Sequence, residues 1–200
     1  MLPVAGPGAD WAFTDHPGKD NWLEGSDEHA PMESGADETT GDGPSLEDAL
    51  SAERALVYGI GGGGDVVGAV PTARFLERHG VETILGGIPW ERPVVDPTPG
   101  PYPLDELTEI ERVSDSVALG RGSTRSTDGV VFAESHVAAH YDEPVALVDI
   151  TGGPAAVAAG LESACDALDL DFVVGVDAGG DVLARGGEPG LRSPIADGVA

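Results

Sequence analysis

In the stretch Ala55-Leu-Val-Tyr-Gly-Ile-Gly-Gly-Gly-Gly-Asp65, a short apolar run passes directly into four glycines. Such a run is typical of a buried parallel strand that leaves its sheet through a tight turn. A glycine pair also follows the apolar run 145–150, in Thr151-Gly-Gly-Pro154, and the run 172–177, in Ala178-Gly-Gly-Asp181. Glycine permits φ > 0 and lets a ligand approach the bare main chain. Three such turns at one edge of a sheet would build a site.

The remainder of the chain alternates between strand-like and helix-like segments, which indicates an α/β fold. Ser45 is expected to cap a short helix, and the six prolines of 88–105 predict an extended loop. We expect strands at 55–60, 83–86, 109–113, 129–133, 145–150 and 171–177, and helices from the glycine turn to Gly80, at 135–142 and at 154–168. The sequence thus predicts a three-layer α/β domain over residues 45–200 with a mainly parallel, Rossmann-like sheet. Because Ser193-Pro194 has the pattern of a helix start, we expect the domain to continue beyond residue 200.

The chain is strongly acidic. Its 200 residues carry a net charge of −26, from 36 acidic and ten basic residues, and Lys19 is the only lysine. This charge repels nucleic acid and anionic lipid, so neither is expected as a partner. Apolar residues make up 40% of the chain and gather in strand-like runs, which argues against disorder for most of it. We interpret it as a folded protein adapted to multimolar salt, where the Debye length falls to about 3 Å or less.

Residues 1–44 differ from the rest, because they are rich in Gly, Pro, Asp, Glu and Ser and show no sustained periodicity. They are predicted to be a disordered acidic tail, with a docking peptide anchored by Trp11 and Trp22 as the alternative. The single cysteine, Cys165, excludes an intrachain disulfide and is expected to be a small core residue. No run approaches the roughly 18 apolar residues of a membrane span. We therefore expect a soluble, cytoplasmic protein.

The glycine turns supply most of the candidate ligand-binding residues. Backbone N–H groups at a glycine-rich helix N-terminus favour an anion or the polar edge of a ligand. Arginine is scarce, and Arg192 follows the third turn, where a guanidinium suits a phosphate or carboxylate; an ion pair with Glu188 is the alternative. The predicted ligand-binding residues are Gly61, Gly62, Gly63, Gly64, Asp65, Gly152, Gly153, Gly179, Gly180 and Arg192. For the first turn, a tight strand-to-helix connection capped by Asp65 remains the alternative.

Four aspartates, Asp65, Asp149, Asp177 and Asp181, fall at or just after the carboxyl ends of predicted strands. At that edge an open parallel sheet forms its binding crevice. We expect Asp177 and Asp181 to be catalytic, as a general base, or to hold Mg²⁺ through their oxygens. For each of the four, a role as a cap or turn residue is the alternative.

The segment Gly59-Ile-Gly-Gly-Gly-Gly64 satisfies the G-x-G-x-x-G pattern of dinucleotide-binding proteins. The rest of that fingerprint fails, because Leu85-Gly-Gly-Ile88 stands where the second strand should end in an acidic residue. A nicotinamide or flavin dinucleotide is therefore not expected. Residues 120–127 are interpreted as a solvated loop, and His136 and His140 as surface or packing residues.

The chain resembles an uncharacterised archaeal family, common in haloarchaea and known only as a domain of unknown function. The resemblance lies in three blocks, which are Gly59-Ile-Gly-Gly-Gly-Gly-Asp-Val-Val-Gly-Ala69, Val176-Asp-Ala-Gly-Gly-Asp-Val-Leu183 and Glu188-Pro-Gly-Leu-Arg-Ser-Pro194. It covers about residues 45–200 and implies that relatives extend further at the C-terminus. It brings no activity.

The leading hypothesis is a cytoplasmic enzyme that binds a small phosphorylated or nucleotide-like metabolite. The amides of 61–64 and 152–153 would hold the anion with Arg192, while Asp177 and Asp181 would handle a metal or a proton. One alternative is a metal-dependent hydrolase of a nucleoside or sugar, and another is a non-catalytic ligand-binding or regulatory module. The sequence predicts no oligomeric state.

The charge leads to a prediction about salt. Residues 53–200 carry 24 acidic and nine basic residues, a net charge of −15. Screening of their repulsion should raise the thermal unfolding midpoint as KCl increases into the molar range. Calorimetry between about 0.1 and 3 M KCl, a span over which the Debye length falls from about 10 Å to less than about 3 Å, measures this. A midpoint that stays flat or falls contradicts the interpretation as a salt-adapted protein.

Overall fold

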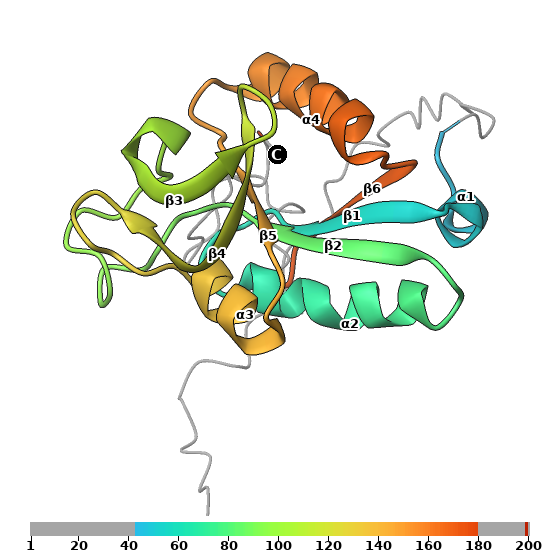
Figure 1. Cartoon of the computed structure of the whole chain (residues 1–200), viewed down its shortest axis with the longest axis horizontal. Coiled ribbons are helices and arrows are strands. Elements are labelled where there is room, and N and C mark those ends of the chain that lie inside the picture. Colours follow the sequence, from blue (N-terminus) through green and yellow to red (C-terminus); the bar gives the residue numbers. More distant parts are fainter. Residues whose placement is uncertain (1–42, 180–198, 200) are drawn as a thin grey trace, which may run out of the picture. The chain divides into compact units, whose positions relative to one another are not determined.

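The computed structural model describes residues 43–179 and residue 199, and its sheet is built around strand β1 (Arg54–Gly59). Successive side chains of a strand point to opposite faces of the sheet. Accordingly, Leu56 and Tyr58 join the apolar cluster that includes helix α4 (Pro154–Leu168). Ala55 and Val57 join the cluster that includes helix α2 (Asp65–Glu77). Both faces of the sheet are covered by helices, as the predicted three-layer architecture requires (Figure 1).

The sheet has six strands in the order β3-β4-β5-β2-β1-β6. Four of them are parallel, namely β1 with its neighbours β2 (Glu82–Gly87) and β6 (Phe172–Val176), and β5 (Val145–Val148) beyond β2. The hairpin of β3 (Leu107–Arg112) and β4 (Val117–Ser126) continues the sheet in antiparallel pairing with β5. The predicted mainly parallel, Rossmann-like α/β fold is therefore confirmed. The remaining elements are α1 (Leu46–Ser51), a 3₁₀ turn (Leu104–Glu106) and α3 (Ala133–Tyr141).

The helices form where the sequence predicts them. Ser45 caps α1 in a reciprocal capping box with Asp48. The buried residues of α2 recur at helical spacing and face the sheet: they are Val66, Ala69, Ala73 and Leu76. Pro71 lies inside α2 rather than in its first turn, so the helix loses one backbone hydrogen bond there. Helix α4 covers the predicted range 154–168, and its Cys165 packs half-buried against the core.

Two expectations about residues 120–133 were wrong. Residues 120–126 belong to β4 and are not a solvated loop, and no strand forms at 129–133. β4 pairs with β3 at residues 118–120 and 125–126 and with β5 at residues 117–120, and its polar residues Thr124 and Ser126 are buried. The Thr124 hydroxyl donates to the Glu109 carbonyl at 2.7 Å, and the Thr124 carbonyl accepts from the Ser135 hydroxyl at 2.7 Å. Hydroxyl-rich composition therefore misled the prediction, since it reveals neither strand pairing nor burial.

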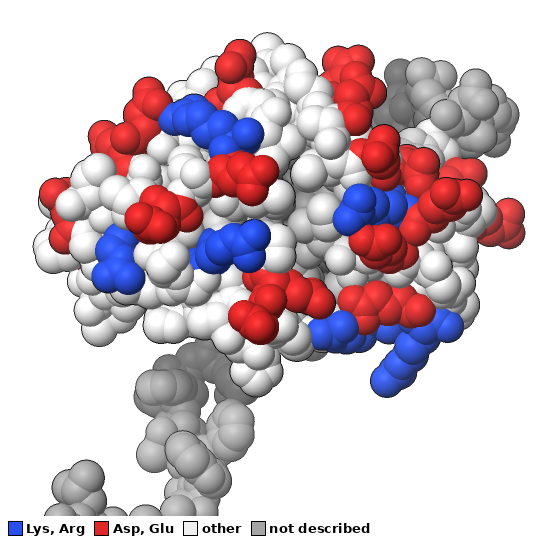
Figure 2. All heavy atoms as spheres, viewed as in Figure 1, with Lys and Arg blue, Asp and Glu red and all other residues white. Residues whose placement is uncertain are grey.

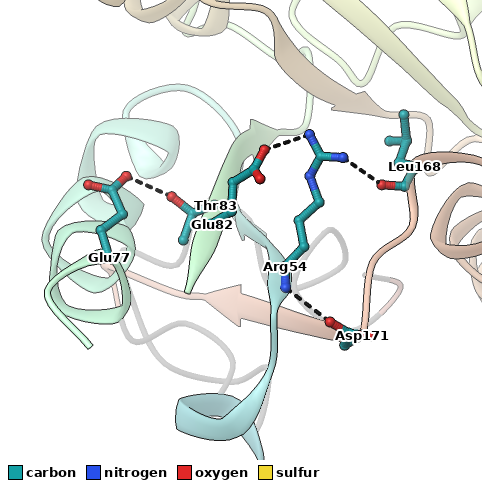
Figure 3. A network of polar contacts seen from close by, with 6 residues as sticks. All are labelled: Arg54, Glu77, Glu82, Thr83, Leu168 and Asp171. Carbon is teal, nitrogen blue, oxygen red and sulfur yellow. Dashed lines mark hydrogen bonds and ion pairs between the residues drawn. The ribbon is translucent and has the colours of Figure 1, made fainter. Parts of the chain in front are cut away.

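The amino ends of the parallel strands are tied together by polar contacts (Figure 3). The guanidinium of Arg54 at the start of β1 contacts the Glu82 carboxylate of β2 at 2.7 Å and donates to the Leu168 carbonyl of α4 at 3.1 Å. The Asp171 carboxylate, just before β6, accepts from the Arg54 amide at 3.0 Å. These contacts fix the ends of three neighbouring strands.

Acidic side chains are distributed over the surface rather than gathered in one patch, as the face drawn in Figure 2 shows. Several arginines lie beside acidic groups on that face, and three arginine–carboxylate ion pairs lie within the described residues. None of the helices in this part of the chain is long and apolar enough to cross a membrane.

The end of β1 gives a prediction about stability. A Cβ on Gly59 would lie 2.3 Å from the carbonyl carbon of Asp65, which is backbone and can yield only if α2 moves. Gly59→Ala should therefore lower the free energy of unfolding by about 2 kcal/mol or more. Gly43→Ala is the matched control, because nothing lies within 4 Å of its added carbon. Urea unfolding at fixed KCl measures both; equal midpoints for the two variants would contradict the close approach.

Candidate functional site

The direction in which successive strands are added to the sheet reverses between the neighbouring strands β1 and β6. The carboxyl ends of these two strands mark that point. From β1 the chain passes through α2 to β2 on one side, whereas β6 is added on the other side after α4. Helices α2 and α4 cover opposite faces, so the connections diverge here, and ligands of open α/β sheets bind at such points. The glycine turn 61–64 and residues 177–179 both begin at this edge. The two strand ends are joined by a hydrogen bond from Ile60 N to Val176 O of 3.0 Å.

The glycine turn has a shape that its residues alone permit. Gly62 and Gly63 have φ of 74° and 56°, a region that favours glycine. The Gly61 amide donates to the Asp65 carboxylate at 3.0 Å. Asp65 is the first residue of α2, so its side chain holds the turn against the helix that follows. Asp65 thus closes a tight turn, as the alternative proposed, but it does not cap the helix, because the N-cap of α2 is Gly64 and no side chain caps it.

A loop from the neighbouring strand completes the turn. The Gly63 amide donates to the Trp90 carbonyl at 2.6 Å. A Cβ on Gly63 would lie 3.9 Å from Nε of Arg92, and one on Gly64 would lie 3.9 Å from its Nη2. The exposed guanidinium of Arg92 therefore lies beside the glycines at the start of α2. Sequence reasoning missed Arg92, although its scarce residue type and its position directly after β2 were available as signals.

The loop that carries Arg92 is held by buried polar contacts. The carbonyl of Arg92 accepts from the amide of Asp96 at 2.9 Å. The Asp96 side chain is 1% exposed and accepts from the Tyr102 hydroxyl at 2.9 Å. The Tyr102 amide donates to the Pro89 carbonyl at 2.9 Å, and the Tyr102 ring packs edge-on against Phe132. The proline-rich segment is therefore an extended loop, as predicted, but one with fixed internal contacts.

Next to this loop lies a buried carboxyl group that the sequence did not single out. Glu134, in the first turn of α3, is 1% exposed, and neither of its side-chain oxygens has a hydrogen-bond partner. Its Oε1 lies 2.2 Å from the place that a Cβ on Gly87 would occupy. The carboxyl of Glu134 thus fills the side-chain position at the end of β2. The neighbouring Glu91 carboxylate accepts from the Ala133 amide at 2.7 Å and so caps α3.

The surroundings of Glu134 disfavour its charged form. Burial raises its pKa from the ordinary value of 4.5 to about 8. Its own backbone amide lowers the pKa in part, although it does not reach hydrogen-bonding geometry with either oxygen, whereas the negative charges of Glu91 and Asp65 raise the pKa. The carboxyl is therefore mostly protonated at pH 7, and in that form it is able to donate one hydrogen bond and to accept others.

The aspartates at the second and third glycine turns, Asp149 and Asp177, accept hydrogen bonds from nearby backbone amides. Gly153 has φ of 79° and precedes α4, and the Asp149 carboxylate is occupied by contacts to Thr151 and to the Leu104 amide. The Asp177 carboxylate accepts from the Gly179 amide at 2.8 Å, and a Cβ on Gly68 of α2 would lie 2.5 Å from the Cβ of Ala178. Ala178, just after β6, therefore lies against α2, close to the first glycine turn.

The remaining predicted residues lie outside the described part of the chain: they are Gly180, Asp181 and Arg192. Within residues 43–179, no three His, Cys, Asp or Glu side chains come close enough to hold a metal ion. His136 and His140 are exposed, as expected. The catalytic and metal roles of Asp177 and Asp181 thus stay predictions.

Two grooves of about 500 and 620 Å³ lie at the opposite, amino edge of the sheet. Their basic groups are already paired. Arg54 contacts Glu82, while Arg74 contacts Glu77 at 2.6 Å and its guanidinium lies 4.7 Å from the centre of the Tyr141 ring. Because these cations are neutralised within the groove, we place the candidate site at the carboxyl edge, where Arg92 has no such pairing among the described residues.

The buried carboxyl leads to a prediction about pH. The folded state keeps the Glu134 proton up to pH about 8, whereas the unfolded chain releases it above about 4.5, so stability should fall as pH rises between these values. Relative to Glu134→Gln, the loss should approach about 1.4 kcal/mol per pH unit. Urea unfolding from pH 5 to 8 measures it, with Glu111→Gln, on exposed β3, as control. A constant difference between wild type and Glu134→Gln contradicts the burial.

Residues 56–200 match a family model whose description is "Protein of unknown function (DUF1152)". The matched segment includes the glycine turn, the Trp90–Arg92 loop and Glu134. No curated protein and no solved structure shows a significant match to the chain. The family match spans most of the chain and confirms the resemblance to an uncharacterised family: the chain belongs to the DUF1152 family of proteins of unknown function.

Proposed function

We propose that this protein is an enzyme that binds a small phosphorylated or nucleotide-like metabolite at the carboxyl edge of its sheet. The observation that carries the proposal is the position of Arg92 beside Gly63 and Gly64, at the N-terminus of α2. A helix N-terminus carries partial positive charge and unpaired amides, which favour an anion. A guanidinium adds a full charge and donors suited to phosphate oxygens.

The hydrogen bonds of the turn leave donors for such an anion. The amides of Gly61 and Gly63 are used by Asp65 and Trp90. The amides of Gly62 and Gly64 donate to no acceptor within the described residues. These two amides and the Arg92 guanidinium would together hold the phosphate. The Asp65 carboxylate opposes an anion, and its bond to the Gly61 amide offsets part of that effect.

The proposal changes which part of the ligand each predicted residue would contact. Gly153 follows β5, which is two strands away from β1 in the sheet. Strands lie about 4.8 Å apart, so the second glycine turn is roughly 10 Å from the first and would contact a different part of the ligand. Arg92 would clamp the anion beside the first turn, and the clamping role expected of Arg192, which lies outside the described residues, stays a prediction. Asp177 and Asp181 remain the candidates for handling a proton or Mg²⁺.

The amino-acid composition supports a cellular environment in which this enzyme would act. One cysteine, one lysine and a net charge of −26 fit a reducing, salt-rich cytoplasm. The same charge argues for a small-molecule ligand rather than nucleic acid or an anionic membrane. Turnover in a screen of phosphorylated metabolites would distinguish an enzyme from a non-catalytic binding module.

Removal of the Arg92 guanidinium tests the anion site. Arg92→Gln should weaken binding of inorganic phosphate roughly tenfold or more, because a charge-assisted contact is lost. Arg121→Gln is the matched control, since Arg121 is an exposed arginine of β4. Calorimetric titration at one fixed KCl concentration measures the affinities, and phosphate should shift the NMR signals of the Gly62 and Gly64 amides. Equal losses in both variants would show only a general charge effect and would contradict the site.

A further inference from the structure

Glu134 occupies a core position at which its carboxyl group lowers the stability of the fold. A buried carboxyl without hydrogen-bond partners destabilises a fold, and an apolar side chain of the same size would pack there without that penalty. Both Glu134 oxygens lack partners, and the side chain is 1% exposed. The position therefore favours a group that gains its hydrogen bonds from something other than the protein itself.

The place of this carboxyl is next to the proposed anion site. It fills the side-chain position of Gly87, the last residue of β2, and Gly87 pairs with Gly59, the last residue of β1. The glycine turn begins two residues after Gly59. One strand spacing, about 4.8 Å, thus separates the position that Glu134 fills from the end of the strand that leads into the turn.

The chemistry of that place points to hydroxyl groups. In open parallel sheets that bind nucleotides, an acidic residue at the end of the second strand accepts hydrogen bonds from ribose hydroxyls. Gly87 stands there in this chain, which removed the dinucleotide fingerprint from the sequence. The structure brings the carboxyl of Glu134 to the same position from α3, a different element. A protonated carboxyl both donates and accepts, so it complements a hydroxyl better than it complements a second anion.

We infer that Glu134 binds a hydroxyl of the ligand, so that the site takes a phosphorylated sugar or a ribonucleotide. The inference rests on the proposed function, in which the glycine turn and Arg92 hold the phosphate. Because Glu134 is buried, its side chain must rotate or the Trp90–Arg92 segment must move aside before a hydroxyl reaches it. The bond between Gly63 N and Trp90 O is the described contact that such a movement would break.

The test compares two phosphate esters that differ in their hydroxyls. Ribose 5-phosphate and ethyl phosphate are titrated calorimetrically into the full chain at pH 7 and fixed KCl. Wild type should bind ribose 5-phosphate roughly tenfold tighter or better, since only this ester offers hydroxyls to Glu134. Glu134→Met keeps the length of the side chain and should abolish the preference while leaving ethyl phosphate affinity unchanged. Glu134→Gln should keep part of it, because an amide also donates and accepts.

Two further variants separate the possible outcomes. Gly87→Ala pushes the carboxyl aside without changing its chemistry and should also reduce the preference, which keeps the test valid if Glu134→Met fails to fold. Glu111→Gln, on exposed β3, should change nothing. A preference that persists in Glu134→Met or in Gly87→Ala, or no preference in wild type, overturns the inference while ethyl phosphate binding still supports the anion site. Failure of both esters to bind overturns the proposed function, and this inference with it.

Discussion

The structure depends on the absence of side chains at the ends of two adjacent strands. Gly59 and Gly87 are the last residues of β1 and β2, and they pair with each other across the two strands. The space that a Cβ on Gly59 would need is filled by the backbone of Asp65, which lets α2 start directly on the strand end. The space beside Gly87 is filled by the Glu134 carboxyl. Because backbone and carboxyl take these places, the helix N-terminus, a loop arginine and a buried acid meet within a small part of one sheet edge.

Most of the fold could be predicted because burial leaves a strong trace in this sequence. The run 55–60 alternates between two faces that both meet apolar partners, and α2 and α4 show apolar residues at helical spacing. Strand β4 escaped prediction because its glycines, arginines and hydroxyls are typical of a loop. Its partners on both sides, β3 and β5, are set by tertiary structure and leave no local signal. Of the hairpin at this edge, β3 was expected at 109–113, and only β4 was missed.

The residues of the candidate site likewise divide into those that the sequence predicted and those that it did not. The glycine turn could be predicted, since φ > 0 and close backbone approach require glycine at fixed positions. The positions of Arg92 and Glu134 could not, because contacts with segments remote in sequence set them, although the scarcity of arginine was a signal for Arg92. Arg92 lies about 30 residues after the turn it approaches, and Glu134 belongs to α3 yet fills a position of β2. Asp65, Asp149 and Asp177 each accept a hydrogen bond from a backbone amide nearby in sequence, as the turn-residue alternative expected, while their functional roles stay predictions.

The central claim is that a neutral carboxyl group lies buried at the end of β2, beside the glycine turn. An NMR titration of the Glu134 side-chain carboxyl carbon, assigned by comparison with Glu134→Gln, tests it most directly. The structure predicts a midpoint at pH about 8, with a displacement toward lower pH in Gly87→Ala, where the added methyl group pushes the carboxyl toward solvent. A midpoint near 4.5 in the wild-type protein would mean that Glu134 is solvated, and would contradict the site.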